Sequence, residues 1–184
     1  MFETLKHLFS FFCGQNPGHT WAPAGLLLPC CERCAGLYVG AAVASVLHLW
    51  LRPRPSNRFL QVHGAFLLLM VPFGFHWLPQ GPVLRTVTGA LFGFGVVTFL
   101  ALPLKKDDAT CVQNAGLGYA FGLSLTVILL PVAASSAGLW AAWTICVLAA
   151  AGLSGIVALV SMDGWVALSS ALRSRHSWQT CLRR

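Results

Sequence analysis

Four of the seven cysteines in this 184-residue chain lie close together, at positions 13, 30, 31 and 34. Cys31 and Cys34 form a C-x-x-C pair directly before a long apolar run, which predicts two sulfurs on one face of the first turn of a helix. The unpaired N–H groups and the dipole at that end of a helix favour thiolate over thiol. Thiolates bind soft metal ions or exchange disulfides, so the cluster predicts one of these two chemistries.

A metal site is one interpretation of this cluster. Three sulfurs and one imidazole would complete a tetrahedral zinc site, and sulfur ligands would also suit Cu(I). The candidate ligands are Cys13, Cys31 and Cys34, with either His19 or His76. Two alternatives stay open: a disulfide, the ordinary fate of paired cysteines on an oxidising outer face, or thiols that are inert or reversibly oxidised. Cys30 is an extra candidate partner in each case.

A second group of candidate ligands is a pair of histidines. His48 lies near the end of the first apolar segment and His63 near the start of the second, so a helical hairpin would bring both to a similar depth. Two facing imidazoles could ligate haem, and one alone could hold a chlorophyll-type pigment. The alternative is a structural role at helix ends, because no haem attachment motif accompanies them. Arg85 could either hold an anionic ligand near the cysteines or extend to the membrane surface.

The composition excludes a soluble domain. Hydrophobic residues make up 57% of the chain and charged residues 9%, with a mean hydropathy of +0.72, whereas soluble domains carry about 25% charged residues. Five segments have the length and apolarity of spanning helices: 34–51, 59–78, 83–103, 110–131 and 138–162. Short loops join them, so the sequence predicts an all-α integral membrane bundle of about five antiparallel helices in contact with the lipid bilayer.

The remaining segments predict three parts of the chain: an N-terminal part over 1–33, the transmembrane bundle over 34–162 and a basic tail over 163–184. Residues 1–13 have the apolar spacing of a short helix in the membrane interface, and a Gly- and Pro-rich loop follows them. The tail has the composition of a basic interfacial helix. Basic residues occur in short groups beside apolar spans, so nucleic acid is not an expected partner.

The distribution of basic residues predicts an orientation. Of the twelve Lys and Arg residues, nine lie in the first loop, the third loop and the tail, which share one side of a five-span bundle. Only Lys6, Arg33 and Arg85 lie on the other side. The positive-inside rule therefore places the C terminus in the cytoplasm, and the N terminus and the cysteine cluster outside.

The cysteine segment also resembles a known family. A Cys-x-Gln pair is followed by the pattern P-x-C-x-R-C-x-G-x-Y-x-G and later by R-x-x-T-G-x-x-x-G; the matching residues are Cys13, Gln15, Pro29, Cys31, Arg33, Cys34, Gly36, Tyr38, Gly40, Arg85, Thr88, Gly89 and Gly93. This order is similar to the bacterial membrane family called domain of unknown function 2085, over roughly residues 10–100. The resemblance implies a bacterial cytoplasmic membrane and no specific activity.

Two polar residues typical of that family are replaced here. Gly14 stands where the family has His, and Phe73 stands where it usually has Asp before Gly74. If the family site is a metal site that uses this His, the chain must borrow His19 or His76. Otherwise the ancestral site has been lost in this chain, and the protein has only a structural role.

The sequence contains no catalytic template and no Asp or Glu between residues 33 and 106, which argues against an enzyme and against a proton-coupled transporter. Three Gly-x-x-x-Gly faces suit close helix contacts, inside the chain or with another subunit. We therefore expect a non-enzymatic accessory or structural subunit of a larger membrane complex, such as an electron-transfer or pigment-bearing one. The alternative is a membrane metal-binding or thiol-redox protein that uses Cys13, Cys31 and Cys34.

Overall fold

The computed structural model describes residues 2–53, 56–75, 77–102, 115–136 and 138–181, with residues 2, 115 and 166–181 as backbone only. This part of the chain holds six α-helices and no strand. The helices are α1 (Phe2–Ser10), α2 (Glu32–Leu51), α3 (Asn57–Gly74), α4 (Pro82–Ala101), α5 (Ala115–Ser135) and α6 (Leu139–Cys181). Two short 3-10 turns, Pro17–His19 and Pro23–Gly25, lie in the loop between α1 and α2. The predicted all-helical membrane bundle is confirmed.

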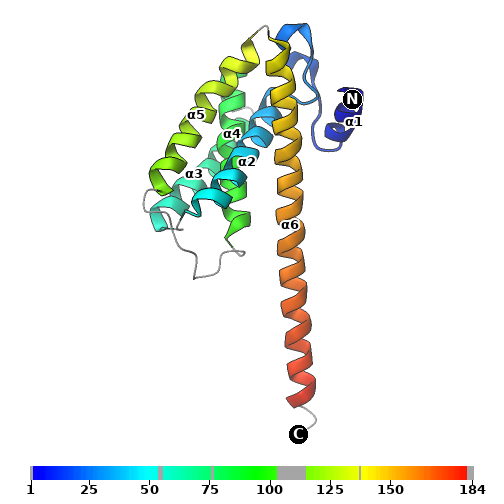
Figure 1. Cartoon of the computed structure of the whole chain (residues 1–184), viewed down its shortest axis with the longest axis vertical. Coiled ribbons are helices and arrows are strands. Elements are labelled where there is room, and N and C mark those ends of the chain that lie inside the picture. Colours follow the sequence, from blue (N-terminus) through cyan, green and yellow to red (C-terminus); the bar gives the residue numbers. More distant parts are fainter. Residues whose placement is uncertain (1, 54–55, 76, 103–114, 137, 182–184) are drawn as a thin grey trace.

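Helix α2 lies at the centre of the bundle and contacts α4, α5 and α6, while α3 packs on α4 (Figure 1). Glycines make the closest of these contacts possible. A Cβ on Gly36 or Gly89 would overlap a backbone carbonyl of the opposite helix, and the same holds for Gly40 and Gly93. In a bilayer, where lipid is as apolar as the helices, such close backbone packing is the main source of helix association. These glycines therefore mediate contacts between helices of the same chain.

The third predicted small-residue face is also occupied within the chain. Gly118 and Gly122 of α5 pack against the side chains of Leu51 and Leu47 of α2. A further close contact was not predicted: Gly152 of α6 lies directly on the Tyr38 carbonyl of α2. Gly152 has no glycine four residues away, so the spacing of glycines gave no signal for it.

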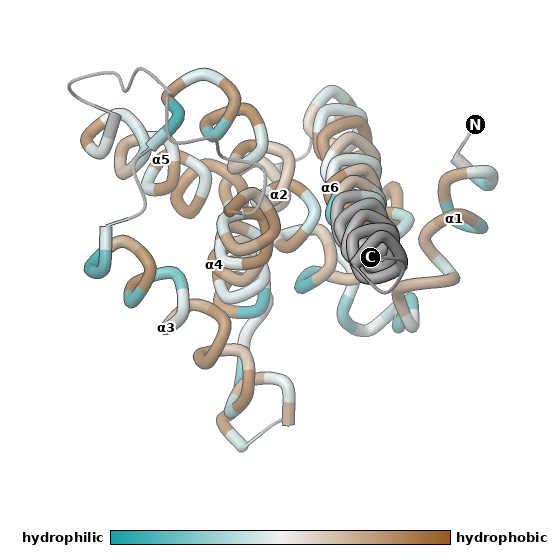
Figure 2. Tube along the Cα trace, turned by 90° about the horizontal axis from the view of Figure 1, so that it is seen from below, coloured by the Kyte–Doolittle hydropathy of each residue, from teal (hydrophilic) through white to brown (hydrophobic). Residues whose placement is uncertain are grey.

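Four of the five predicted spans are long and apolar enough to cross a membrane: α2, α4, Gly116–Ser135 of α5 and Leu139–Trp165 of α6. The second predicted span corresponds to α3, which is not among these four in the described part of the chain. Its first half carries Asn57, Arg58, Gln61 and His63, which lower its mean hydropathy. Figure 2 shows apolar residues along most of the other bundle helices.

The C-terminal end differs from the prediction of a separate interfacial helix. Helix α6 continues without interruption for 43 residues, past Asp163 and Gly164. At 1.5 Å per residue it is roughly 65 Å long, which is about twice the hydrocarbon thickness of a bilayer. It therefore extends well beyond the other helices (Figure 1). Neither residue at the predicted break interrupts the helix, because a single Gly costs only about 1 kcal/mol there.

Candidate metal centre

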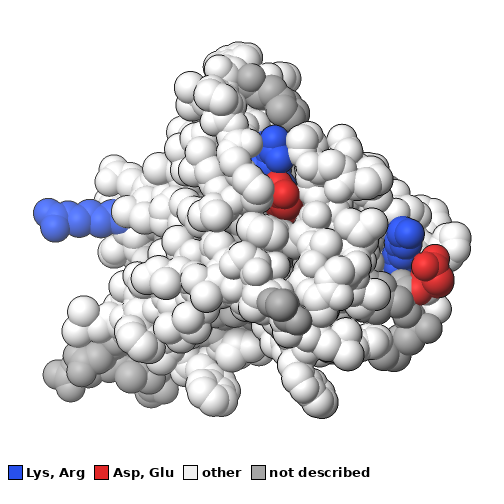
Figure 3. Space-filling view, turned by 90° about the horizontal axis from the view of Figure 1, so that it is seen from above, with Lys and Arg blue, Asp and Glu red and all other residues white. Residues whose placement is uncertain are grey.

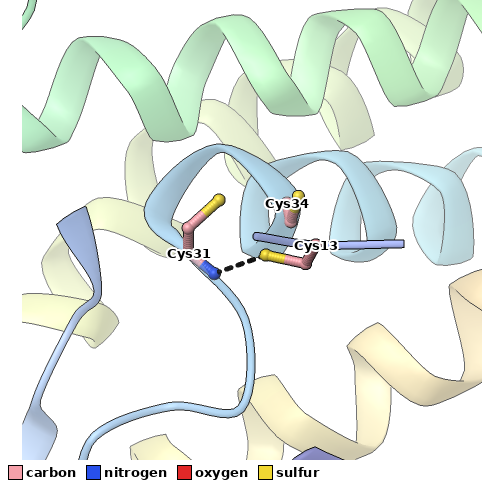
Figure 4. A group of neighbouring side chains, drawn as sticks. All are labelled: Cys13, Cys31 and Cys34. Atoms are coloured by element: carbon pink, nitrogen blue, oxygen red, sulfur yellow. Dashed lines mark hydrogen bonds between the residues drawn. The ribbon is translucent and has the colours of Figure 1, made fainter. Parts of the chain in front are cut away.

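The structure brings three of the predicted ligands together. The Sγ atoms of Cys13, Cys31 and Cys34 all lie within 4.8 Å of one another (Figure 4). Cys31 is the N-cap residue of α2 and Cys34 lies in its first turn, so their spacing places both side chains on one side of the helix. Cys13 comes from the loop after α1. We call these three residues the sulfur triangle.

Three contacts hold the segment around Cys13 at the mouth of α2. Phe9 of α1 is fully buried and its ring lies 5.3 Å from that of Tyr38. The side-chain amide of Gln15 donates to the carbonyl of Lys6 and, at 2.9 Å, to that of Pro29. Gln15 has a φ of 45°, a left-handed conformation that is uncommon for a residue other than glycine. The Cys-x-Gln motif thus places the first sulfur and fixes the loop that carries it.

The surroundings of Cys13 favour its thiolate. Its Sγ accepts backbone N–H groups from Cys31 at 3.2 Å and from Gln15 at 3.5 Å. The pKa of Cys13 is lowered far below its ordinary value, chiefly by the Cys31 thiol and then by the Cys34 thiol, which both donate to it. The pKa of Cys31 is raised, mainly because its thiol is that donor. The site therefore favours a thiolate at Cys13. Metal binding would release the protons of the other thiols, so we expect the metal affinity to fall as the pH falls.

Cys30 lies outside the sulfur triangle. It is only 1% exposed and packs in the same apolar core as Cys146 of α6. Burial raises the pKa of the Cys30 thiol well above its ordinary value. A buried thiol of this kind packs as a small apolar residue, and a role of Cys30 as an extra partner of the cluster stays a prediction.

The structure places His19 away from the sulfur triangle. Its Nδ1 accepts from Arg85 Nη1 at 2.7 Å, and the same Nη1 lies 3.1 Å from Oε2 of the buried Glu32. Arg85 thus pairs with groups of the chain itself. Figure 3 shows few charged groups on the face of the molecule seen from above. The other predicted imidazole, His76, lies outside the described residues. Among those described, no fourth His, Cys, Asp or Glu joins the three sulfurs.

Arg33, between the two α2 cysteines, points to the end of α3. Its Nη2 donates to the Phe73 carbonyl and to Oε1 of Gln80, both at 2.8 Å. Gln80 also donates to the Phe73 carbonyl. Gln80 therefore supplies an acceptor for Arg33 beside the Phe73 carbonyl. No sequence pattern pointed to Gln80.

The imidazole rings of His48 and His63 both lie against the ring of Tyr119 of α5. The Nδ1 of His63 donates to the Phe59 carbonyl at 2.8 Å, and its Nε2 accepts from the Tyr119 hydroxyl at 3.1 Å. The Nδ1 of His48 donates to the Ala44 carbonyl at 2.9 Å, and its ring lies 5.3 Å from that of Tyr119. A haem or pigment metal at His63 would have to displace Tyr119. The cofactor role of this pair stays a prediction.

The comparisons with known proteins agree with the sequence resemblance. Residues 13–99 match the model of a family described as "Predicted membrane protein (DUF2085)". The match begins at Cys13, so it contains the sulfur triangle together with α2, α3 and most of α4. No curated protein and no solved structure matches the chain.

Proposed function

We propose that this integral membrane protein binds a soft metal ion, with Cu(I) as the preferred ion, through Cys13, Cys31 and Cys34. The proposal rests on one observation: the three sulfur atoms lie within 4.8 Å of one another. Three thiolates around one ion at about 2.3 Å lie about 4 Å from one another, so small side-chain movements would complete the site. Each of the three cysteines has a defined place in the backbone. Cys13 lies in the loop after α1, Cys31 is the N-cap residue of α2 and Cys34 lies in the first turn of α2.

The choice of ion follows from the ligand set. The three ligands are all sulfur, and soft thiolates select Cu(I) and zinc over harder ions. A structural zinc site needs four ligands, whereas a three-ligand site leaves one zinc position for water or substrate. Of the two imidazoles predicted to complete a zinc site, His19 bonds to Arg85 in the described structure. Three sulfurs alone therefore favour Cu(I), and zinc would require His76 or an external fourth ligand.

A metal titration tests this proposal. Protein reduced and purified without oxygen is loaded with Cu(I), passed over a desalting column and analysed for copper and for free thiols. We expect about one copper per chain, and the reactivity of three thiols with a thiol reagent should fall when copper is bound. Less than a tenth of an equivalent of retained copper, with all thiols still reactive, would exclude a soft-metal site.

The prediction of an accessory subunit stays a prediction. One of its motives was the set of glycine faces, and all three are occupied by other helices of the same chain. Exposed apolar side chains on α5 and α6, such as Phe121 and Trp140, suit lipid and a neighbouring subunit equally well. The sulfur triangle is the more specific feature, so we place metal binding first.

We also propose that the sulfur triangle faces the outside of a bacterial cytoplasmic membrane, because nine of the twelve basic residues belong to the two loops and the tail that the sequence assigns to the opposite side. Labelling in a cysteine-free background tests this orientation. We expect a membrane-impermeant maleimide to label Gly81→Cys in intact cells, and Asn57→Cys only after permeabilisation. Asn57 is the first residue of α3, Gly81 is the N-cap residue of α4, and both are exposed. The reverse pattern would invert the orientation.

A further inference from the structure

The three cysteines of the sulfur triangle are attached to the bundle in two different ways. Cys31 and Cys34 lie at the start of α2, and half of the α2 span is buried inside the molecule. Gly36 and Gly40 of α2 lie against the backbone of α4, and Gly152 of α6 lies against the backbone of α2. Backbone contacts this close leave a helix little room to shift. These two sulfurs are therefore held firmly by the bundle.

Cys13 comes instead from a peripheral segment, residues 2–15, which we call the N-terminal strap. Its helix, α1, lies at the edge of the molecule (Figures 1 and 2). Among the described side chains of the strap, only those of Phe9 and Cys13 are buried. No glycine in the described part of the chain brings the α1 backbone close to another helix. The strap is therefore packed less tightly than α2.

Few of the described contacts join the strap to the rest of the chain. Its one fully buried ring is that of Phe9. Two hydrogen bonds reach the start of α2: Gln15 donates to the Pro29 carbonyl at 2.9 Å, and Cys13 Sγ accepts from the Cys31 N–H at 3.2 Å. Segments with few buried apolar side chains are the ones that open while the rest of a protein stays folded. Cys13 is therefore the ligand that can leave the triangle without disturbing α2.

We propose that the sulfur triangle exchanges Cu(I) with a small external thiol, and that Cys13 is the ligand that leaves when the strap opens. This inference rests on the metal binding proposed above and names the exchange partner of that site. A thiol is the matching partner, because soft thiolates select Cu(I). Cys31 and Cys34 are each partly exposed, so a small thiolate can reach the ion beside them with the strap still in place.

The exchange forms one Cu–S bond and breaks one. The thiolate of the acceptor binds the ion beside Cys31 and Cys34, the Cu–S bond to Cys13 breaks, and the Cys13 sulfur takes up the proton that the acceptor thiol gave up. Copper stays Cu(I) throughout, so no oxidant or reductant takes part. The same exchange at Cys31 and Cys34 completes the transfer, and the reverse sequence loads the site.

The first test compares two replacements of single ligands. In Cys13→Ser both remaining sulfurs lie on one side of α2, whereas in Cys34→Ser the remaining pair is divided between α2 and the strap. Cys13→Ser should therefore keep a Cu(I) affinity at least tenfold higher than that of Cys34→Ser, measured by competition with a Cu(I) chelator. Equal affinities would overturn the proposal.

The second test measures the loss of copper to glutathione, which serves as the small thiol. Copper-loaded protein in detergent is mixed with glutathione without oxygen, and the retained copper is measured after desalting at intervals. We expect a rate proportional to the glutathione concentration and at least fivefold faster in Phe9→Ala, which loses the buried ring. The matched control is Phe11→Ala: this ring is 81% exposed, so its loss should leave the rate unchanged.

Gln15→Glu opens the strap without removing a core side chain. The carboxylate has the same size but cannot donate to the Pro29 carbonyl, so exchange should again be at least fivefold faster. A wild-type rate in this variant, or a rate independent of glutathione, would overturn the proposal. The copper retained before glutathione is added separates the two claims. No retained copper refutes the metal site and the exchange with it, whereas retained copper with equal rates in all variants refutes only the opening of the strap.

Discussion

Replacing Cys34 by serine is expected to lower the affinity for Cu(I) by more than about a hundredfold. Substitutions outside the ligand shell of metal sites already cost about 10–100-fold, and this change removes one of only three ligands. The remaining pair, Cys13 and Cys31, would leave the ion undercoordinated. Competition with a Cu(I) chelator of known affinity measures the loss.

The matched control for this experiment is Cys146→Ala. Cys146 is a buried core residue, 1% exposed, and it lies outside the sulfur triangle. Its loss should leave copper affinity unchanged and cost stability only through a small cavity. If Cys34→Ser binds copper like the wild type, or if Cys146→Ala weakens binding equally, the ligand set is wrong.

The second large effect is expected at Gly152. A Cβ at this position would overlap the Tyr38 carbonyl of α2, which is backbone and cannot move aside like a side chain. Gly152→Ala should therefore force α6 away from α2, at a cost of about 3 kcal/mol or more. We expect a lower melting temperature in detergent and a smaller monodisperse fraction in size-exclusion chromatography.

Gly164→Ala is the control on the same helix. A Cβ there has no neighbour within 4 Å, so only helix propensity changes, and that favours alanine by about 1 kcal/mol. Its stability should equal or exceed that of the wild type. Equal melting temperatures for the two variants would show that α6 does not pack against α2 as described.

The sequence was informative wherever a single local pattern determines the outcome. Apolar length predicted five spans, and in the described part of the chain four of them are helices long and apolar enough to cross a membrane. The C-x-x-C spacing predicted two sulfurs on one side of the α2 entrance, because helix geometry fixes residues three apart. The Gly36 and Gly89 motifs predicted close packing, although the choice between an internal and an external partner required the structure.

Contacts between distant segments could not be predicted from local patterns. His19 is a candidate ligand by its residue type, and the structure pairs it with Arg85, 66 residues away. Its role as a ligand stays a prediction. Gln80 and Tyr119 gave no sequence signal, since a lone amide or phenol in an apolar chain has no spacing to interpret. The sequence-based prediction placed the end of the last span at Asp163 and Gly164. Helix α6 continues past both residues, because an exposed helix tolerates a charged residue and a single glycine.

Gln15 shows how a motif acquires a physical meaning. The sequence identified it only as part of a family pattern beside Cys13. In the structure its amide joins the end of α1 to the residues before α2, and its backbone N–H faces the Cys13 sulfur. The Cys-x-Gln motif therefore joins a candidate ligand, Cys13, to the residue that holds its loop in place.

X-ray absorption spectroscopy of the copper-loaded protein tests the central claim most directly. The structure predicts a first shell of three sulfur atoms at about 2.3 Å, as for other thiolate sites, with no nitrogen or oxygen ligand. The edge should be that of Cu(I). A first shell dominated by nitrogen or oxygen, or one with fewer than two sulfurs, would contradict a copper site built from Cys13, Cys31 and Cys34.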